Sequence, residues 1–247
     1  MLKPIKKPYS DLIQKNLAGE YNFDLKVILA KGFENTTSSI WIFFQMIFVV
    51  FGISLVIATI YIKFQGIQTM EQFTQSHLMT LDLVIQLVIA PFTAAMMLQG
   101  ANSHIKRLAN VRFLFSTLPQ ALPICVVTGF ILLLTKIGMT LFILPGLYLM
   151  IATSFAVLLV ADKRLTPIDA IILSVKMVNR YLFPFTILYF LFLILLILSI
   201  VSFGIGLLLL IPFYYNVNGM LYSELFGYGS ADETLQPDSA GDSTFDA

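Results

Sequence analysis

Long apolar stretches separated by short polar segments dominate the pattern of this chain. Six of them approach the roughly 20 apolar residues that a helix needs to cross the hydrocarbon core of a membrane. They cover residues 40–62, 83–98, 118–135, 141–161, 181–201 and 203–225. Pro91 interrupts the second stretch, where we expect a kinked helix because neighbouring helices can satisfy the freed backbone groups. The pattern predicts an all-α integral membrane protein with six transmembrane helices.

The polar segment after the fourth stretch has the pattern of a short amphipathic helix. Thr166 is placed to cap it, Pro167 to take its first position and Asp169 its third. Apolar residues then recur at helical spacing: Ile168, Ile171, Ile172, Val175 and Val178. At about 14 residues this helix is too short to span. We therefore expect it to lie in the plane of the cytoplasmic interface.

Two other polar segments resemble it. The one before the first stretch places Leu25, Ile28, Leu29 and Phe33 on one helical face, and residues 104–123 form a poorer copy. We predict three tandem units, each an interfacial helix followed by a transmembrane hairpin. Chance similarity among amphipathic helices is the alternative.

A Pro-Gly pair marks the start of the fourth stretch. Pro145 loses no hydrogen bond in the first turn of a helix, and Gly146 permits close packing after a tight outside turn. The stretch ends at Asp162, Lys163 and Arg164, which we place at the cytoplasmic interface.

Composition and charge agree with a membrane location. The chain is 58% hydrophobic and 12% charged, whereas soluble domains are about 25% charged. With the N-terminus inside, every Lys and Arg except Lys63 and Lys136 falls in a cytoplasmic segment. This bias predicts that both termini are cytoplasmic. Because Cys125 is the one cysteine, no intramolecular disulfide can form.

The chain divides into three parts on this interpretation. Residues 1–39 form a cytoplasmic segment with its interfacial helix, and residues 40–225 form the transmembrane domain. Residues 226–247 are small, polar and acidic without a basic residue, so we expect a disordered cytoplasmic tail.

The run Leu144-Pro145-Gly146, the later Val160-Ala161-Asp162-Lys163 and the helix with Ser174 and Lys176 carry a family resemblance. Together they resemble the YciC-type group of bacterial inner-membrane proteins. More distantly they resemble the membrane domain fused to some glycerophosphoryl diester phosphodiesterases. The resemblance covers about residues 20–226 and implies a six-helix inner-membrane protein with a role in the cell envelope. It brings no catalytic residues, and the chain has no phosphodiesterase domain.

The spans contain little that could carry chemistry. We find no ionisable residue in their interiors, no metal-ligand pattern and no nucleotide-binding motif, so we expect no enzyme and no cofactor. The densest polar group is Tyr214, Tyr215, Asn216 and Asn218, which follow Pro212 in the sixth span. They are a candidate cavity lining; the alternative is that such residues form hydrogen bonds between helices.

The basic residues Lys163, Arg164, Lys176 and Arg180 are expected at the cytoplasmic interface, near anionic headgroups. The expected partners are membrane lipids and other inner-membrane proteins, with no nucleic acid; the sequence leaves the oligomeric state open. The favoured function is a non-catalytic role in envelope organisation through these contacts. The alternative is a transporter or lipid-handling protein with a neutral polar cavity near the sixth span. The two differ in whether Asn216 and Asn218 face a cavity or a neighbouring helix.

Overall fold

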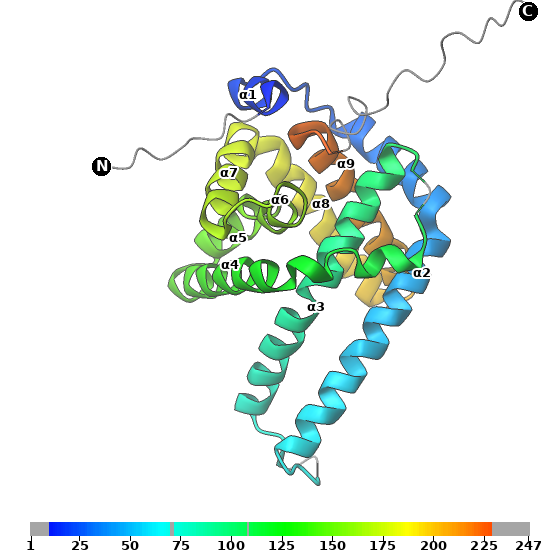
Figure 1. Cartoon of the computed structure of the whole chain (residues 1–247), viewed down its shortest axis with the longest axis vertical. Coiled ribbons are helices and arrows are strands. Elements are labelled where there is room, and N and C mark those ends of the chain that lie inside the picture. The colour runs from blue at the N-terminus through cyan, green and yellow to red at the C-terminus, as the bar shows by residue number, and fades with distance from the viewer. Residues whose placement is uncertain (1–9, 70–71, 108, 229–247) are drawn as a thin grey trace, which may run out of the picture.

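The computed structural model describes residues 10–69, 72–107 and 109–228, and all regular structure in these ranges is helical (Figure 1). The α-helices are α1 (Asp11–Ala18), α2 (Leu25–Phe64), α3 (Gln75–His104), α4 (Ala121–Leu141), α5 (Ile143–Ala152), α6 (Ala156–Lys163), α7 (Pro167–Arg180), α8 (Leu182–Val201) and α9 (Leu207–Phe226). Two short 3-10 helices, η2 (Val111–Phe115) and η3 (Leu118–Gln120), precede α4. The predicted tail falls almost entirely outside the described residues.

Five helical segments are long and apolar enough to cross a membrane. They are α2, α3, Val111–Leu141, Ile143–Lys163 and α8. The sixth predicted span, α9, is not among them, because Asn216, Asn218, Ser223 and Glu224 make it less apolar. These segments are identified by length and composition alone. Their helices are not all parallel, because α4 lies crosswise to α3 in Figure 1. They are the segments expected of a multi-pass membrane protein.

The three polar segments that we predicted as similar interfacial helices have different structures. The segment before the first span is not a separate interfacial helix, because it continues into the span as the 40-residue α2. Its Gly32 lies against α9, where an added Cβ would be 2.4 Å from Val217 Cγ2. The second connector contains 3-10 turns, and only the third forms the expected separate helix, α7. The predicted tandem repeat is therefore not matched at these connectors.

α7 has the predicted cap but a different buried face. Thr166 Oγ1 accepts a hydrogen bond from Asp169 N, as the sequence predicts. The side chains that pack against the protein are those of Ala170, Leu173, Ser174, Met177 and Val178, whereas Ile168 and Ile172 are exposed. The predicted apolar face is therefore divided: Ile168 and Ile172 are exposed as expected, whereas Val178 packs against the protein.

α9 is the most enclosed long helix, and its contact with α3 is backbone to backbone. A Cβ on Gly219 would lie 2.4 Å from Ala101 N and from Met97 O. A Cβ on Gly100 would lie 2.2 Å from Tyr215 O. Small residues at such a crossing let two helices approach closely, which is how membrane helices gain packing energy. The predicted role of Gly146 is the same, since an added Cβ there would meet Met139 N at 2.7 Å.

Pro91 lies inside α3 without breaking it. A proline has no N–H, so it leaves the carbonyl four residues earlier, that of Leu87, without its helical donor. Cys125 on α4 supplies one, with its Sγ 3.2 Å from Leu87 O. A neighbouring helix therefore satisfies the freed group, as the sequence predicts, and the donor is the chain's one cysteine.

This contact gives a first prediction. Cys125→Ala should destabilise the protein by about 1 kcal/mol, because Leu87 O would lose its donor inside the membrane. Cys125→Ser retains a hydroxyl donor and should remain close to wild type. The thermal unfolding midpoints of both variants in detergent check this, and equal midpoints would show that the thiol contributes only its volume.

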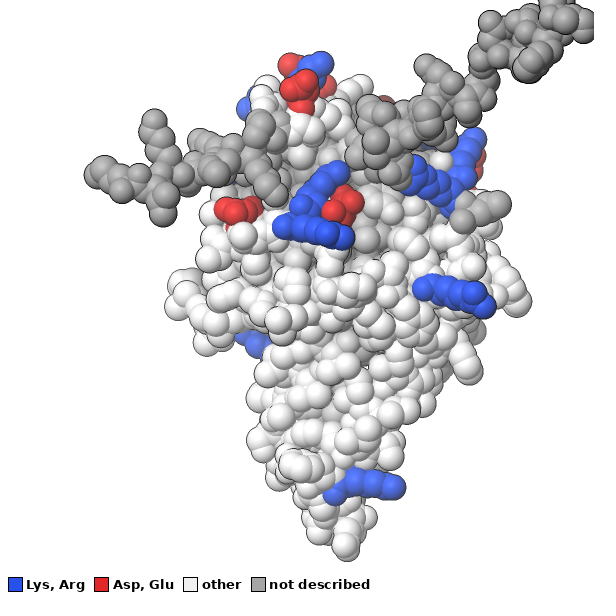
Figure 2. Space-filling view, in the orientation of Figure 1, with Lys and Arg blue, Asp and Glu red and all other residues white. Residues whose placement is uncertain are grey.

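Charged side chains gather at one end of the molecule (Figure 2), the end at which α1, α7 and the last turn of α9 meet in Figure 1. The face of the tapered opposite part that Figure 2 shows, formed by the α2–α3 hairpin, has few charged side chains; Lys63 and Asp82 belong to this hairpin. This segregation is the spatial counterpart of the Lys and Arg bias that the sequence carries.

Candidate functional site

A break in the fourth predicted span is the most unusual feature of the bundle. The segment 141–161 was predicted as one helix, but it forms α5 and α6, separated at Thr153–Phe155. Thr153 Oγ1 donates to Leu149 O at 2.8 Å, and such bonds to the carbonyl four residues earlier bend helices. Backbone groups at the break would be costly in lipid unless another part of the protein satisfied them.

Ser174 of α7, which lies outside this span, forms hydrogen bonds with the backbone groups at the break. Its Oγ accepts a hydrogen bond from Phe155 N at 3.2 Å and donates one to Ala152 O at 2.8 Å. The Ser174 side chain is fully buried. The amphipathic helix α7 is thus part of the packed bundle, because its Ser174 hydroxyl bonds a backbone group on each side of the break.

The residues at the break line a cavity of about 450 Å³ between α3, α4, α5, α6, α8 and α9. Its polar groups come from Thr153, Ser154, Tyr189, Tyr214 and Tyr215, and the remaining lining side chains are apolar. The lining contains no Asp, Glu, Lys or Arg. The Ser154 Oγ is buried and interacts with the Tyr189 phenol. The cavity is within the roughly 300–1,000 Å³ range of small-molecule sites.

Exposed apolar side chains stand where the cavity meets the surface. Met150 is 43% exposed, Leu193 46% and Leu196 40%, and all three contribute to the lining. An apolar rim of this kind would face acyl chains rather than water in a bilayer. The cavity is therefore suited to an apolar molecule that enters sideways from the membrane.

The two asparagines of the predicted cavity lining point at neighbouring helices instead. Asn218 Oδ1 accepts a hydrogen bond from Tyr189 OH at 2.9 Å, and Asn216 Nδ2 donates to Ser39 Oγ of α2 at 3.2 Å. Tyr214 and Tyr215 do line the cavity. Asn218 takes part indirectly, because it fixes the tyrosine ring that forms part of the wall.

Sequence reasoning missed three polar lining residues, Thr153, Ser154 and Tyr189. The adjacent Thr-Ser pair inside an apolar run was the available signal, since hydroxyl residues that bond their own helix favour bends. Tyr189 carried no signal of its own. Its position next to α9 depends on how the last two spans pack together.

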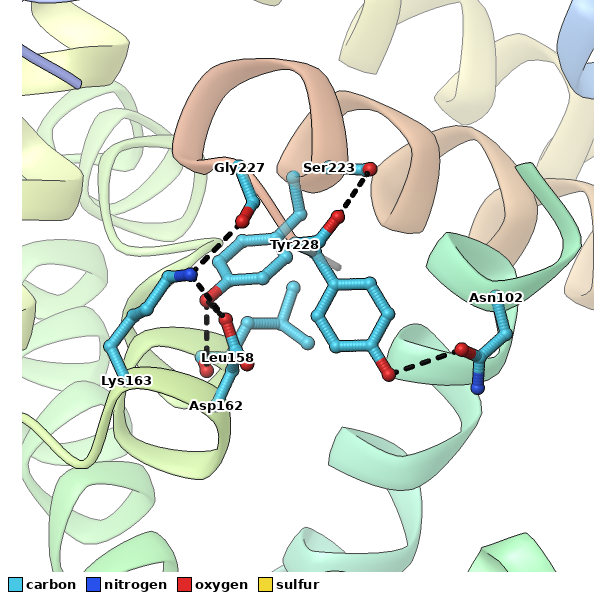
Figure 3. Close-up of polar contacts among 8 residues, drawn as sticks. Asn102, Leu158, Asp162, Lys163, Ser223, Gly227 and Tyr228 are labelled. Carbon is cyan, nitrogen blue, oxygen red and sulfur yellow. Dashed lines mark hydrogen bonds and ion pairs between the residues drawn. The ribbon is translucent and has the colours of Figure 1, made fainter. Parts of the chain in front are cut away.

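The predicted basic residues lie at the charged end of the molecule. Lys163 Nζ is 3.2 Å from Asp162 Oδ2 and donates to Gly227 O at 3.1 Å, which ties α6 to the end of α9 (Figure 3). Arg180 Nη2 donates to Ala18 O. Arg164 and Lys176 are exposed. The contacts of Lys163 and Arg180 are therefore structural, and the placement of Arg164 and Lys176 near headgroups stays a prediction.

The same layer contains further links between elements distant in sequence. Tyr222 OH donates to Asp162 Oδ2 at 2.7 Å, and Tyr228 OH donates to Asn102 Oδ1 of α3 at 3.1 Å (Figure 3). Each bond joins the end of α9 to a different helix. The residues of the Val160–Lys163 motif therefore serve to close this end of the bundle.

Glu224 organises the neighbouring part of the layer. Its carboxylate accepts a hydrogen bond from Tyr21 OH and lies 3.5 Å from both Lys31 Nζ and His104 Nε2. Burial, and then the bond to Glu224, raise the pKa of the Tyr21 phenol above its usual range. Asn16 of α1 donates to the Glu224 and Leu225 carbonyls. These hydrogen bonds join α1, near the start of the described residues, to the end of α9.

Within the described residues, no three His, Cys, Asp or Glu side chains converge as a metal site requires. Comparisons with protein-family models, curated proteins and solved structures give no match to this chain. The resemblance to the YciC-type group therefore stays a prediction.

Proposed function

We propose that this protein is a six-span inner-membrane protein, with both termini in the cytoplasm, that binds and handles a neutral amphiphilic lipid. The gathering of charge at one end supports this topology (Figure 2). On this proposal α9 is the sixth span, and its polar residues are sheltered by α2, α3 and α8. The inner-membrane location rests on the resemblance to the YciC-type group.

The observation that carries the function is the interrupted helix that lines the cavity. Irregular backbone at membrane depth occurs where it is buried in protein or lines a cavity, and transporters form substrate sites from such discontinuous helices. Here the break contributes the Thr153 and Ser154 hydroxyls to a largely apolar wall. Hydroxyl groups without a nearby charge favour a ligand with an acyl chain and an uncharged polar end. Diacylglycerol is the simplest membrane lipid of this kind.

Native mass spectrometry of protein released from nanodiscs containing diacylglycerol tests the proposal. Leu193→Trp at the cavity rim should reduce the diacylglycerol adduct by about tenfold or more, the effect of losing about 1.4 kcal/mol of binding free energy. Ile197→Trp is the matched control, because Ile197 lies one turn away on α8, is 53% exposed and does not line the cavity. The control should retain the adduct.

Equal adducts in wild type and Leu193→Trp would contradict a ligand in this cavity. A wild-type protein without an adduct would contradict lipid handling itself. The same experiment therefore separates a wrong site from a wrong function.

The contact function favoured by the sequence remains the second candidate. Asn216 and Asn218 point at neighbouring helices, which is the outcome expected of that function, and the α2–α3 hairpin also supports it. Phe48, Phe51, Ile60 and Met79 are between 59% and 77% exposed on its outer part. Such a surface can pack against lipid or against another membrane protein. An envelope-organising role would use this hairpin and leave the cavity without a ligand.

A further inference from the structure

A second pocket, of about 250 Å³, lies between α2 and α3 toward the charged end of the bundle. Unlike the cavity at the helix break, it is lined mainly by polar side chains, among them Asn35, Ser38, Ser39, Gln99 and Ser103. Two adjacent cations, Lys106 and Arg107, complete the wall. A polar pocket at the level where spans leave the membrane is placed to meet lipid headgroups.

The two sites are independent of each other. Met97 lines the first cavity, whereas Gln99, two residues later on α3, lines the second pocket. Between them α3 and α9 touch through Gly100 and Gly219, with no space for a side chain. A ligand in one site therefore does not extend into the other.

Two amide groups in the pocket wall have unused hydrogen-bonding capacity. Gln99 is only 1% exposed, and its Oε1 has no hydrogen-bond partner among the described residues. Asn35 Nδ2, on the facing helix, is also buried without a partner. One atom is an acceptor and the other a donor, so a ligand hydroxyl could satisfy both. Buried polar groups without partners are uncommon, and each calls for an explanation.

The cations are fixed in an unusual way. Lys106 has a φ of +56°, a conformation that favours glycine. Its N–H bonds Ser103 O and the Arg107 N–H bonds Asn102 O, which closes the end of α3. This geometry sets the direction in which both cations leave the helix. Glu34 is the one acidic lining residue, so the pocket has an excess of positive charge.

We propose that this pocket binds the headgroup of an anionic phospholipid that carries both a phosphate and a hydroxyl. The phosphate would lie at Lys106 and Arg107, and the hydroxyl between Asn35 and Gln99. Phosphatidylglycerol has this chemistry, phosphatidic acid lacks the hydroxyl, and phosphatidylethanolamine lacks the net charge. A soluble phosphate ester such as glycerol 3-phosphate shares the chemistry without the membrane anchor.

The test is native mass spectrometry of full-length protein from nanodiscs with equal amounts of the three phospholipids. Wild type should retain phosphatidylglycerol at least about fivefold better than either of the other two, the scale of one lost hydrogen bond or charge. Lys106→Gly is the decisive variant, because glycine relieves the backbone strain while it removes the cation. We expect its thermal stability to be equal to or above that of wild type and its phosphatidylglycerol adduct to fall by about fivefold.

Two further variants complete the design. Gln99→Leu should reduce the preference for phosphatidylglycerol over phosphatidic acid, since it removes the partner of the hydroxyl. Lys63→Gln, which changes an exposed cation in the last turn of α2, far from the pocket along that helix, should leave the adduct unchanged.

Unaltered phosphatidylglycerol binding by Lys106→Gly, or equal binding of all three lipids by wild type, would overturn the proposal. In detergent, saturable calorimetric binding of glycerol 3-phosphate that displaces phosphatidylglycerol would assign the pocket to a soluble ester instead. The absence of such displacement is the result we expect. Neither outcome affects the Leu193→Trp test of the first cavity.

Discussion

Gly219→Ala should lower the thermal unfolding midpoint by on the order of 10 °C, the shift expected for a loss of about 3 kcal/mol in a chain of this size. The added Cβ would lie 2.4 Å from two backbone atoms of α3, Ala101 N and Met97 O. Backbone atoms at the centre of two packed helices cannot rotate away as a flexible side chain would. The helices would have to separate, and α9 would lose its longest contact.

The control for this substitution is Gly52→Ala in α2. Gly52 also lies inside a long helix, but an added Cβ there meets no atom within 4 Å. Because alanine favours helix more than glycine does, we expect an unchanged or slightly higher midpoint. Circular dichroism melts of the two variants in the same detergent make the comparison. Similar midpoints for both would show that α3 and α9 are not packed as closely as described.

Ser174→Ala should open the break between α5 and α6. The substitution removes the acceptor of Phe155 N and the donor to Ala152 O, both of which are buried. Each unsatisfied backbone group costs about 1–3 kcal/mol, so we expect a total destabilisation of about 2–4 kcal/mol or a rearranged helix. Hydrogen exchange of peptides covering residues 150–160 should become faster, because the amide of Phe155 loses its protection.

Two variants distinguish this effect from the loss of any hydroxyl. Ser174→Thr retains an oxygen at the same position and should restore slow exchange. Ser54→Ala removes a hydroxyl that bonds only Val50 O of its own helix, and exchange at the break should be unaffected. Wild-type exchange in Ser174→Ala would mean that the break does not depend on α7.

Much of the architecture could be predicted because it depends on properties that are local in the chain. Long apolar runs identify the candidate spans whatever they pack against, since the solvent for their surface is lipid. The Thr166 cap, the glycine contact after Pro145 and the satisfied backbone at Pro91 likewise follow from a few adjacent residues and from general backbone chemistry. The sequence also determined the segregation of charge to one end, because Lys and Arg occur in alternate polar segments.

The candidate sites were decided by tertiary structure, because their atoms come together from distant parts of the chain. Asn218 and Tyr189 are 29 residues apart, and Asn216 and Ser39 are 177 apart. Whether an asparagine faces a cavity or a helix depends on such partners, and the spacing along α9 contains no information about them. The same holds for the junction of the first amphipathic segment with α2, where contact with α9 favours one continuous helix. Sequence alone determined where apolar and charged surface lies. Only the packing of the helices determined where the polar atoms find partners and where some of them, such as Gln99 Oε1 and Asn35 Nδ2, do not.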